Sequence, residues 1–130
     1  MWIIWNVEKM KLDLQQLNVS LMLLLPIVAK SKNDVSVRLT NERWTHIITS
    51  HTDMKNNKDL VLKTVKEPDM ILKGVNEELR AVRFFLKTHL GPKYVMTAYK
   101  ELNDGEGFII TAYKTSKIDK IVKRGVIWKK

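Results

Sequence analysis

The chain of 130 residues contains no cysteine. This absence excludes a disulfide scaffold, a thiolate metal site and a cysteine nucleophile. The longest apolar run, Val19–Ala29, is shorter than the roughly twenty residues that a helix needs to cross a bilayer, so we expect no stable insertion into a membrane. Neither a Gly-X-Y repeat nor a heptad repeat is present, which excludes a fibrous protein.

Familiar chemical motifs are missing too. The sequence has no Walker loop, dinucleotide-binding glycine pattern, Gly-x-Ser-x-Gly elbow or His-Glu-x-x-His pair. Its three histidines have no acidic cluster beside them. His46 and His51 lie about 140° apart around a helix, too far to hold one ion together, and His89 beside a Gly-Pro turn is expected to be exposed. We therefore expect neither a metal ion nor a cofactor.

What is present is an ordinary apolar content of 45% and a large excess of basic residues. The length and composition predict one globular domain with its own core. Lys and Arg number 23 against 14 acidic residues, a formal charge of +9. This surplus favours a polyanionic partner, either nucleic acid or an anionic membrane surface.

Two thirds of the surplus lies in residues 107–130, which hold seven basic residues and one acidic residue. The basic residues alternate with apolar ones, among them Ile118, Ile121 and Trp128. This pattern predicts a tract that folds back onto the domain and presents its charges to phosphates. A solvated tail is the alternative.

Residues 1–34 form an N-terminal apolar extension whose structure the sequence leaves open. Lys9 and Lys11 precede the apolar run as in a secretory signal, but Asp13 and three further polar residues separate them from it. The alternatives are an element that packs on the domain, a segment that mediates a homodimer, or an extension from an upstream start codon. We expect a cytoplasmic protein.

From residue 35 to 130 the pattern predicts an α+β domain. Alternation predicts a strand at Val35–Leu39, and Thr40 or Asn41 can cap the helix that follows. A second helix is expected from about Asp53 to Glu67. Four further strands are predicted at Met70–Val75, Leu79–Lys87, Lys93–Leu102 and Phe108–Thr115. These elements predict one or two helices packed on one face of a roughly four-stranded antiparallel sheet.

The polar residues on these elements favour metal-free phosphodiester chemistry. RNA cleavage by a ribose 2′-hydroxyl needs a base, an acid and cations that hold the phosphate. Histidine exchanges protons near neutral pH, and arginine binds phosphate through paired hydrogen bonds. Residues of the required types are His46, His51, Arg43, Arg80, Arg83, Lys100, Thr111 and Tyr113. The last two share a strand face, either as hydroxyls at a cleft or only as strand-forming residues.

The other candidates have structural alternatives as well. His51 continues the apolar face of its helix and could be a packed helix-end histidine. His46 points away from that face and could simply be exposed, and Arg43 could pair with a nearby acid. Arg80 and Arg83 fall on opposite faces of a strand, so at most one of them faces any given site.

Four short motifs occur in order along the predicted domain. They are Leu39-Thr-Asn-Glu-Arg-Trp-Thr-His-Ile47 followed by His51, Glu67-Pro-Asp-Met-Ile71, Gly107-Phe-Ile-Ile-Thr-Ala-Tyr113 and a closing Trp128-Lys129. Over about residues 35–130 the chain thereby resembles the PBECR group of the barnase–EndoU–colicin–RelE-like (BECR) nuclease superfamily. One residue departs from the family pattern: Thr52 stands where members often have proline.

The resemblance implies a small α+β domain with its active site on the exposed sheet face, acting as a metal-independent ribonuclease. Matched by position, the catalytic residues would be His46, His51, Arg43 and Thr111. The residues expected to bind RNA or phosphate are Arg80, Arg83, Lys100, Tyr113, Lys114 and Lys117.

We therefore predict a metal-independent endoribonuclease that cleaves RNA by 2′-hydroxyl attack. As the resemblance implies, it would be a toxin of a toxin–antitoxin or phage-conflict system, with an antitoxin or immunity protein as partner. One alternative is a catalytically inactive nucleic-acid-binding or regulatory domain on the same fold. Another is a membrane-surface or protein-interaction module that uses the N-terminal segment.

Overall fold

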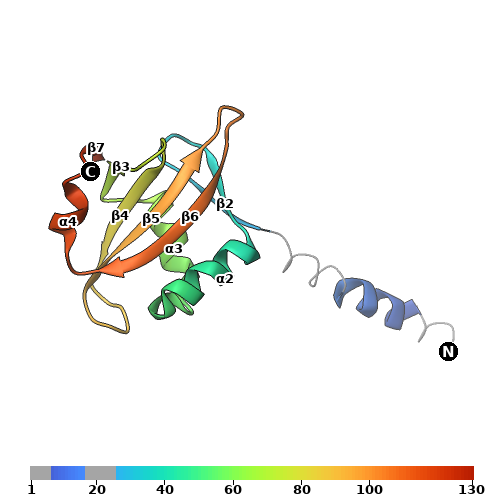
Figure 1. The fold of residues 1–130 in the computed structure, drawn as a ribbon. Helices are drawn as coiled ribbons and strands as arrows, with labels where there is room; N and C mark the ends of the chain where they lie inside the picture. The colour runs from blue at the N-terminus through green and yellow to red at the C-terminus, as the bar shows by residue number, and fades with distance from the viewer. Residues whose placement is uncertain (1–6, 17–25) are drawn as a thin grey trace.

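The computed structural model describes residues 7–16 and 26–130 and has an α+β architecture (Figure 1). Residues 7–16 are helical. The elements that follow are β1 (Ile27–Lys30), β2 (Ser36–Leu39), α2 (Asn41–Ser50), the 3-10 helix η1 (Thr52–Met54), α3 (Lys58–Lys66), β3 (Met70–Lys73), β4 (Leu79–Phe85), β5 (Lys93–Glu101), β6 (Glu106–Thr115), α4 (Ile118–Val122) and β7 (Val126–Lys129). The expectations for residues 1–5 and for most of the apolar run, residues 19–25, lie outside the described ranges.

Seven strands form one mixed sheet in the order β1-β2-β6-β5-β4-β3-β7. The expectation of a roughly four-stranded antiparallel sheet is therefore wrong. The four strands predicted from residue 70 onward form the central antiparallel meander β3-β4-β5-β6. β1 and β2 extend it on one side, where β2 runs parallel to β6, and β7 pairs with β3 on the other. β1 and β7 are only four residues long, so local alternation gives little sign of them.

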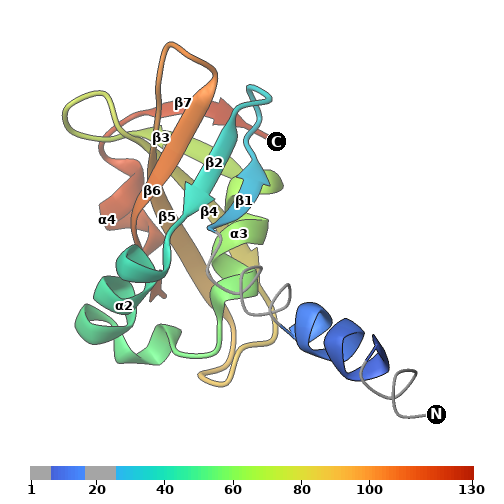
Figure 2. The same ribbon diagram turned by 90° about the vertical axis from the view of Figure 1, so that its right-hand side faces the viewer.

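Helices cover both faces of the sheet (Figure 2). α2 and α3 pack on one face, where the larger core contains Ile47, Val61 and Tyr99. α4 lies against the other face, where Ile121 packs with Met96. The prediction that the basic C-terminal tract folds back onto the domain is thus confirmed. The expectation of helices on one face only is wrong, because the same tract supplies α4.

The helix expected from about Asp53 to Glu67 is split into η1 and α3. Asn56, between them, has a φ of +65°, a left-handed conformation that asparagine tolerates and an α-helix does not. α3 ends at Lys66, before Pro68 as predicted. The break allows Met54 of η1 to be fully buried in the core, so that η1 packs against β6.

β6 is longer than the strand that pairs with it on its outer side. β2 reaches only the first part of β6, with Ser36–Arg38 opposite Glu106–Phe108. The chain then turns into α2, which Thr40 caps: its side chain accepts a hydrogen bond from the Arg43 backbone N–H at 3.1 Å. α2 and η1 pack against β6. The end of α2 is thereby brought to the C-terminal part of β6.

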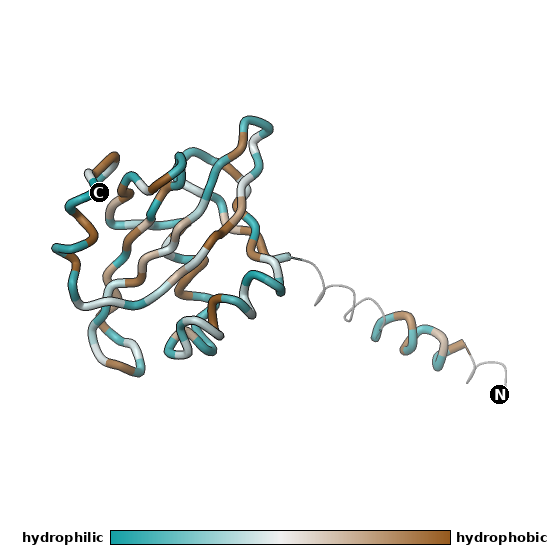
Figure 3. The backbone as a smooth tube through the Cα atoms, in the orientation of Figure 1, coloured by the Kyte–Doolittle hydropathy of each residue, from teal (hydrophilic) through white to brown (hydrophobic). Residues whose placement is uncertain are grey.

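The described part of the expected N-terminal extension contains an exposed helix and the strand β1. All of residues 7–16 are exposed, including Met10 and Leu14, and apolar and polar residues are mixed along this helix (Figure 3). β1 pairs with β2 and buries Ala29, so the sheet begins before the expected boundary at residue 35. Within residues 7–16 and 26–130, no helix has the length and apolar character needed to cross a membrane.

Gly107 is buried where β6 passes between β2 and β5. A Cβ here would come within 2.5 Å of the Lys100 carbonyl oxygen and 3.3 Å of Val37 Cγ2. Because the closer contact is with backbone, side-chain rotation cannot relieve it. We expect Gly107→Ala to lower the free energy of unfolding by about 1–3 kcal/mol in urea denaturation. Glu106→Ala, at the exposed neighbour, should change it by less than about 1 kcal/mol; an equal effect of both changes would contradict the tight packing.

Candidate active site

His51 is held beside Tyr113 at the end of β6. It forms the C-cap of α2, where its backbone N–H donates to the Ile47 carbonyl oxygen at 2.7 Å. The His51 and Tyr113 rings lie 5.6 Å apart between centroids and are tilted by 36°. Both side chains are half-buried. The imidazole therefore packs on the tyrosine while keeping access to solvent, which a group that exchanges protons requires.

The next residue on β6, Lys114, joins three segments of the chain. Its Nζ donates to the Asp53 carbonyl oxygen at 2.6 Å and to Asn57 Oδ1, and it lies 3.3 Å from His89 Nδ1. Burial lowers the pKa of Lys114 below its usual value, although the nearby charge of Asp53 acts in the opposite direction. Lys114 thus ties η1 and the start of α3 to the turn between β4 and β5.

We call two contacts, His51 with Tyr113 and His89 with Lys114, the strand-end cluster; Tyr113 and Lys114 are adjacent on β6 and face opposite sides of the sheet. Imidazole is a side chain suited to general acid–base chemistry, and an ammonium can stabilise negative charge on a phosphate. The three N–H groups of Lys114 already face three protein acceptors. A phosphate that binds Lys114 would therefore have to displace one of these acceptors. Among Asp53, Asn57 and His89, the most exposed is His89.

Arg80 and Thr111 lie in one cross-strand row on the α4 face of the sheet. Both are paired with Ala98 of β5, which stands between them. Arg80 donates two hydrogen bonds to Glu78 Oε1, from Nε at 2.9 Å and Nη2 at 2.7 Å, and both side chains are largely buried. A phosphate would have to compete with this carboxylate for Arg80.

The remaining predicted site residues are spread over the domain. His46 and Arg43 are exposed on α2, Lys117 is exposed before α4, and Lys100 is half-buried on β5 opposite Phe108. Arg83 lies on the α3 face, where its Nη1 donates to the Glu67 carbonyl oxygen at 2.6 Å. In the described part of the chain, His51 contacts Tyr113 and Lys114 contacts His89. Within that part, none of the five residues named in this paragraph contacts either pair.

The α4 face also differs from the bare sheet face that the resemblance implies. Ile118 and Ile121 of α4 pack there with Ile110 and Tyr113. This helix covers part of the face on which Thr111 lies. The accessible part of the predicted site is therefore its edge, where β6 runs beyond β2 and His51 approaches Tyr113.

His89 is the residue that sequence reasoning missed. Its position beside Gly91-Pro92 predicts only an exposed turn, and it is indeed exposed, yet its ring reaches Lys114. The antiparallel order of the strands could have indicated that His89 lies near Lys114. β4 ends at Phe85 opposite Lys93, and Tyr94 pairs with Thr115, so the turn between β4 and β5 lies at the sheet end where β6 finishes.

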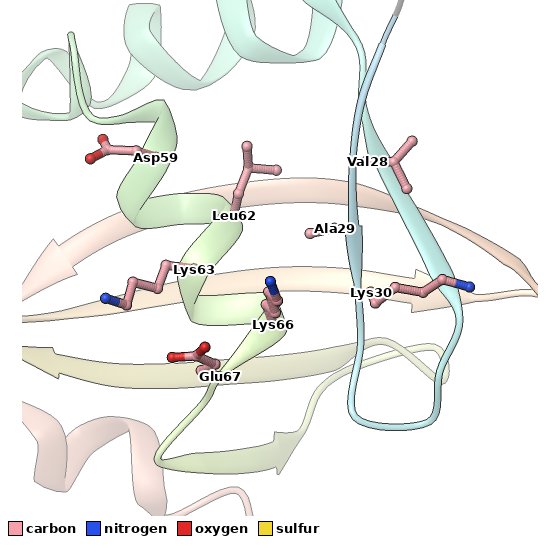
Figure 4. Close-up of a pocket in the computed structure, with 8 residues that line it drawn as sticks. All are labelled: Val28, Ala29, Lys30, Asp59, Leu62, Lys63, Lys66 and Glu67. Atoms are coloured by element: carbon pink, nitrogen blue, oxygen red, sulfur yellow. The ribbon is translucent and has the colours of Figure 1, made fainter.

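A hollow of about 550 Å³ lies away from this cluster, between α3 and β1 (Figure 4). None of the predicted site residues lines it. No group of three or more His, Asp or Glu residues in the described ranges is arranged to hold a metal ion.

Comparison of the chain with models of protein families, with curated proteins and with solved structures finds no match.

Proposed function

We propose that the protein is a metal-independent endoribonuclease of the BECR type whose proton-transfer groups lie in the strand-end cluster. The observation that carries the proposal is that two contacts lie at the end of β6, His51 with Tyr113 and His89 with Lys114. Two imidazoles and one cation are the groups that 2′-hydroxyl attack on a phosphodiester needs. The basic charge of the chain suits a polyanionic substrate such as RNA.

The proposed reaction uses each group once. One imidazole removes the proton from the ribose 2′-hydroxyl, whose oxygen attacks the adjacent phosphorus. Lys114 stabilises the added negative charge on the phosphate oxygens. The other imidazole donates a proton to the leaving 5′-oxygen as its bond to phosphorus breaks. The products are a 2′,3′-cyclic phosphate and a free 5′-hydroxyl.

The biological setting of this proposal follows from the motif resemblance alone. A toxin of a toxin–antitoxin or phage-conflict system would act on cytoplasmic RNA and would be neutralised by an antitoxin or immunity protein. The charge of +9 suits an acidic inhibitor that covers the RNA-binding surface.

The test is incubation of the purified protein with total RNA and with tRNA in EDTA, beside a double variant carrying His46→Ala and His51→Ala. We expect cleavage by the wild type alone and fragments that end in 2′,3′-cyclic phosphate. Activity that disappears in EDTA and returns with a divalent ion would refute the metal-independent mechanism. Equal cleavage by the double variant would refute the assignment of His51.

A catalytically inactive RNA-binding domain is the second candidate, and specific contacts favour it. Arg80 is engaged by Glu78, Arg83 by Glu67, and all three donors of Lys114 by protein acceptors. Cations already bonded to protein acceptors are less available to stabilise the charge that develops during cleavage. Salt-sensitive RNA binding by the wild type without any cleavage would select this candidate.

A further inference from the structure

Two hollows meet at the C-terminal end of α3. The hollow of about 550 Å³ runs between α3 and β1 (Figure 4). A second, of about 260 Å³, lies between the end of α3, Arg83 on β4 and Trp128 on β7. Lys66 and Glu67 line both. The two hollows are therefore neighbours, and we call them together the α3 groove.

The α3 groove gathers positive charge from distant parts of the chain. Its lining contains two acidic residues, Asp59 and Glu67, against six basic ones. The basic residues are Lys30, Lys32, Lys63, Lys66, Arg83 and Lys130. This net of four positive side chains is nearly half of the +9 carried by the whole chain. A groove that concentrates charge in this way attracts a polyanion.

Trp128 supplies an aromatic surface at one end of the groove. It is half-buried on β7, where it pairs with Ile71 of β3. Lys32 Nζ lies 4.7 Å from the centroid of its ring. Arg83, on the same wall, is fixed by its hydrogen bond to the Glu67 carbonyl oxygen. A base that stacks on the indole would take the place of the Lys32 ammonium, which would then be free to bind a neighbouring phosphate. Aromatic stacking beside cations is the combination by which proteins hold single strands.

We propose that the α3 groove binds single-stranded RNA, with one base stacked on Trp128 and the neighbouring phosphates held by Lys66 and Lys130. The choice of RNA rests on the proposed function. The two hollows meet at the C-terminal end of α3, at Lys66, whereas Lys114 contacts Asn57 at the N-terminal end of the same helix. The meeting point is therefore separated from the strand-end cluster by the length of α3. Nine helical residues span about 13 Å, a distance that a short single strand bridges. The groove would thus hold the RNA beside the bond to be cut.

The test measures binding of a fluorescein-labelled hexauridylate with 2′-O-methyl groups by fluorescence anisotropy. We expect Trp128→Leu to weaken binding roughly ten-fold, because base–aromatic stacking is lost, and Trp128→Phe to stay close to wild type. Lys66→Gln should weaken binding and lower the salt-dependence slope by about 0.7, the value for one phosphate contact with a single strand. Lys73→Gln removes the same charge from an exposed position outside the groove and should change neither.

Wild-type affinity in both Trp128→Leu and Lys66→Gln would overturn the proposal. If circular dichroism shows that Trp128→Leu is unfolded, Lys66→Gln and Lys130→Gln decide the matter alone. Displacement of the hexauridylate by hexaglutamate at equal concentration would also overturn it, since the groove would then recognise acidic chains in general. The 2′-O-methyl probe cannot be cleaved by 2′-hydroxyl attack. Binding that depends on Trp128 in a protein that cleaves no RNA would therefore refute the proposed function and retain the groove.

Discussion

Replacing His51 with alanine is expected to lower the rate of RNA cleavage by about 10²–10⁴-fold, the range for loss of one general acid or base. His51 is the histidine that the structure places against Tyr113, in the turn whose Asp53 carbonyl contacts Lys114. The side chain is half-buried. Its loss should therefore leave the fold intact, and the drop should appear in the first-order rate constant for single-turnover cleavage of a defined RNA.

The matched control is His46→Ala on the same helix. His46 is exposed and lies five residues before His51, so its side chain leaves α2 in a different direction. We expect this variant to keep cleavage within a few-fold of wild type, and His89→Ala to show a loss comparable to His51→Ala. A large loss in His46→Ala with full activity in His89→Ala would return the second proton-transfer role to His46, as the family resemblance implies.

Local signals in the sequence were enough to place most elements. The cap at Thr40 and the stop before Pro68 act within one turn of the chain, and the structure has both. The strands expected at Lys93–Leu102 and Phe108–Thr115 are likewise present as β5 and β6. Each of these depends on the conformational preferences of a few adjacent residues, which a single sequence displays directly.

The sequence did not predict the strands whose position depends on other parts of the chain. β1 and β7 are short edge strands whose place depends on β2 and β3, and β7 begins more than fifty residues after β3 ends. The break at Asn56 was missed because residues 55–59 are all polar, so apolar spacing gives no sign there of whether the helix continues. Buried Met54 shows what the break achieves: it carries η1 onto β6, an outcome set by tertiary packing over helix propensity.

The candidate site was predictable in part for the same reason. His51 and Tyr113 could be chosen from residue type and strand alternation, but that their rings meet follows from where β2 stops along β6. Arg80 and Arg83 lie on opposite faces, as alternation requires. That Glu78 and Glu67 already engage them is a matter of side-chain placement, which spacing does not reveal. The excess of basic side chains along the α3 groove likewise arises only because β1, α3 and β7 lie side by side in the fold.

Ile47→Ala is expected to cause the largest loss of stability among these variants, about 2–5 kcal/mol in urea denaturation. Ile47 is 1% exposed and is the buried residue of α2, packed in the larger core with Trp44 at its edge. Removing its outer carbons leaves a cavity between α2 and the sheet that the rigid β6 cannot close. The m-value should stay constant if only stability changes.

The same substitution at Ile127 provides the control, because this residue is 58% exposed on β7. We expect Ile127→Ala to cost less than about 1 kcal/mol. The comparison also bears on catalysis. Ile47 accepts the backbone hydrogen bond of His51 and anchors the helix that His51 closes, so Ile47→Ala should reduce cleavage even where the protein is still folded. Undiminished cleavage by folded Ile47→Ala would show that the packing of this side chain does not govern the position of His51.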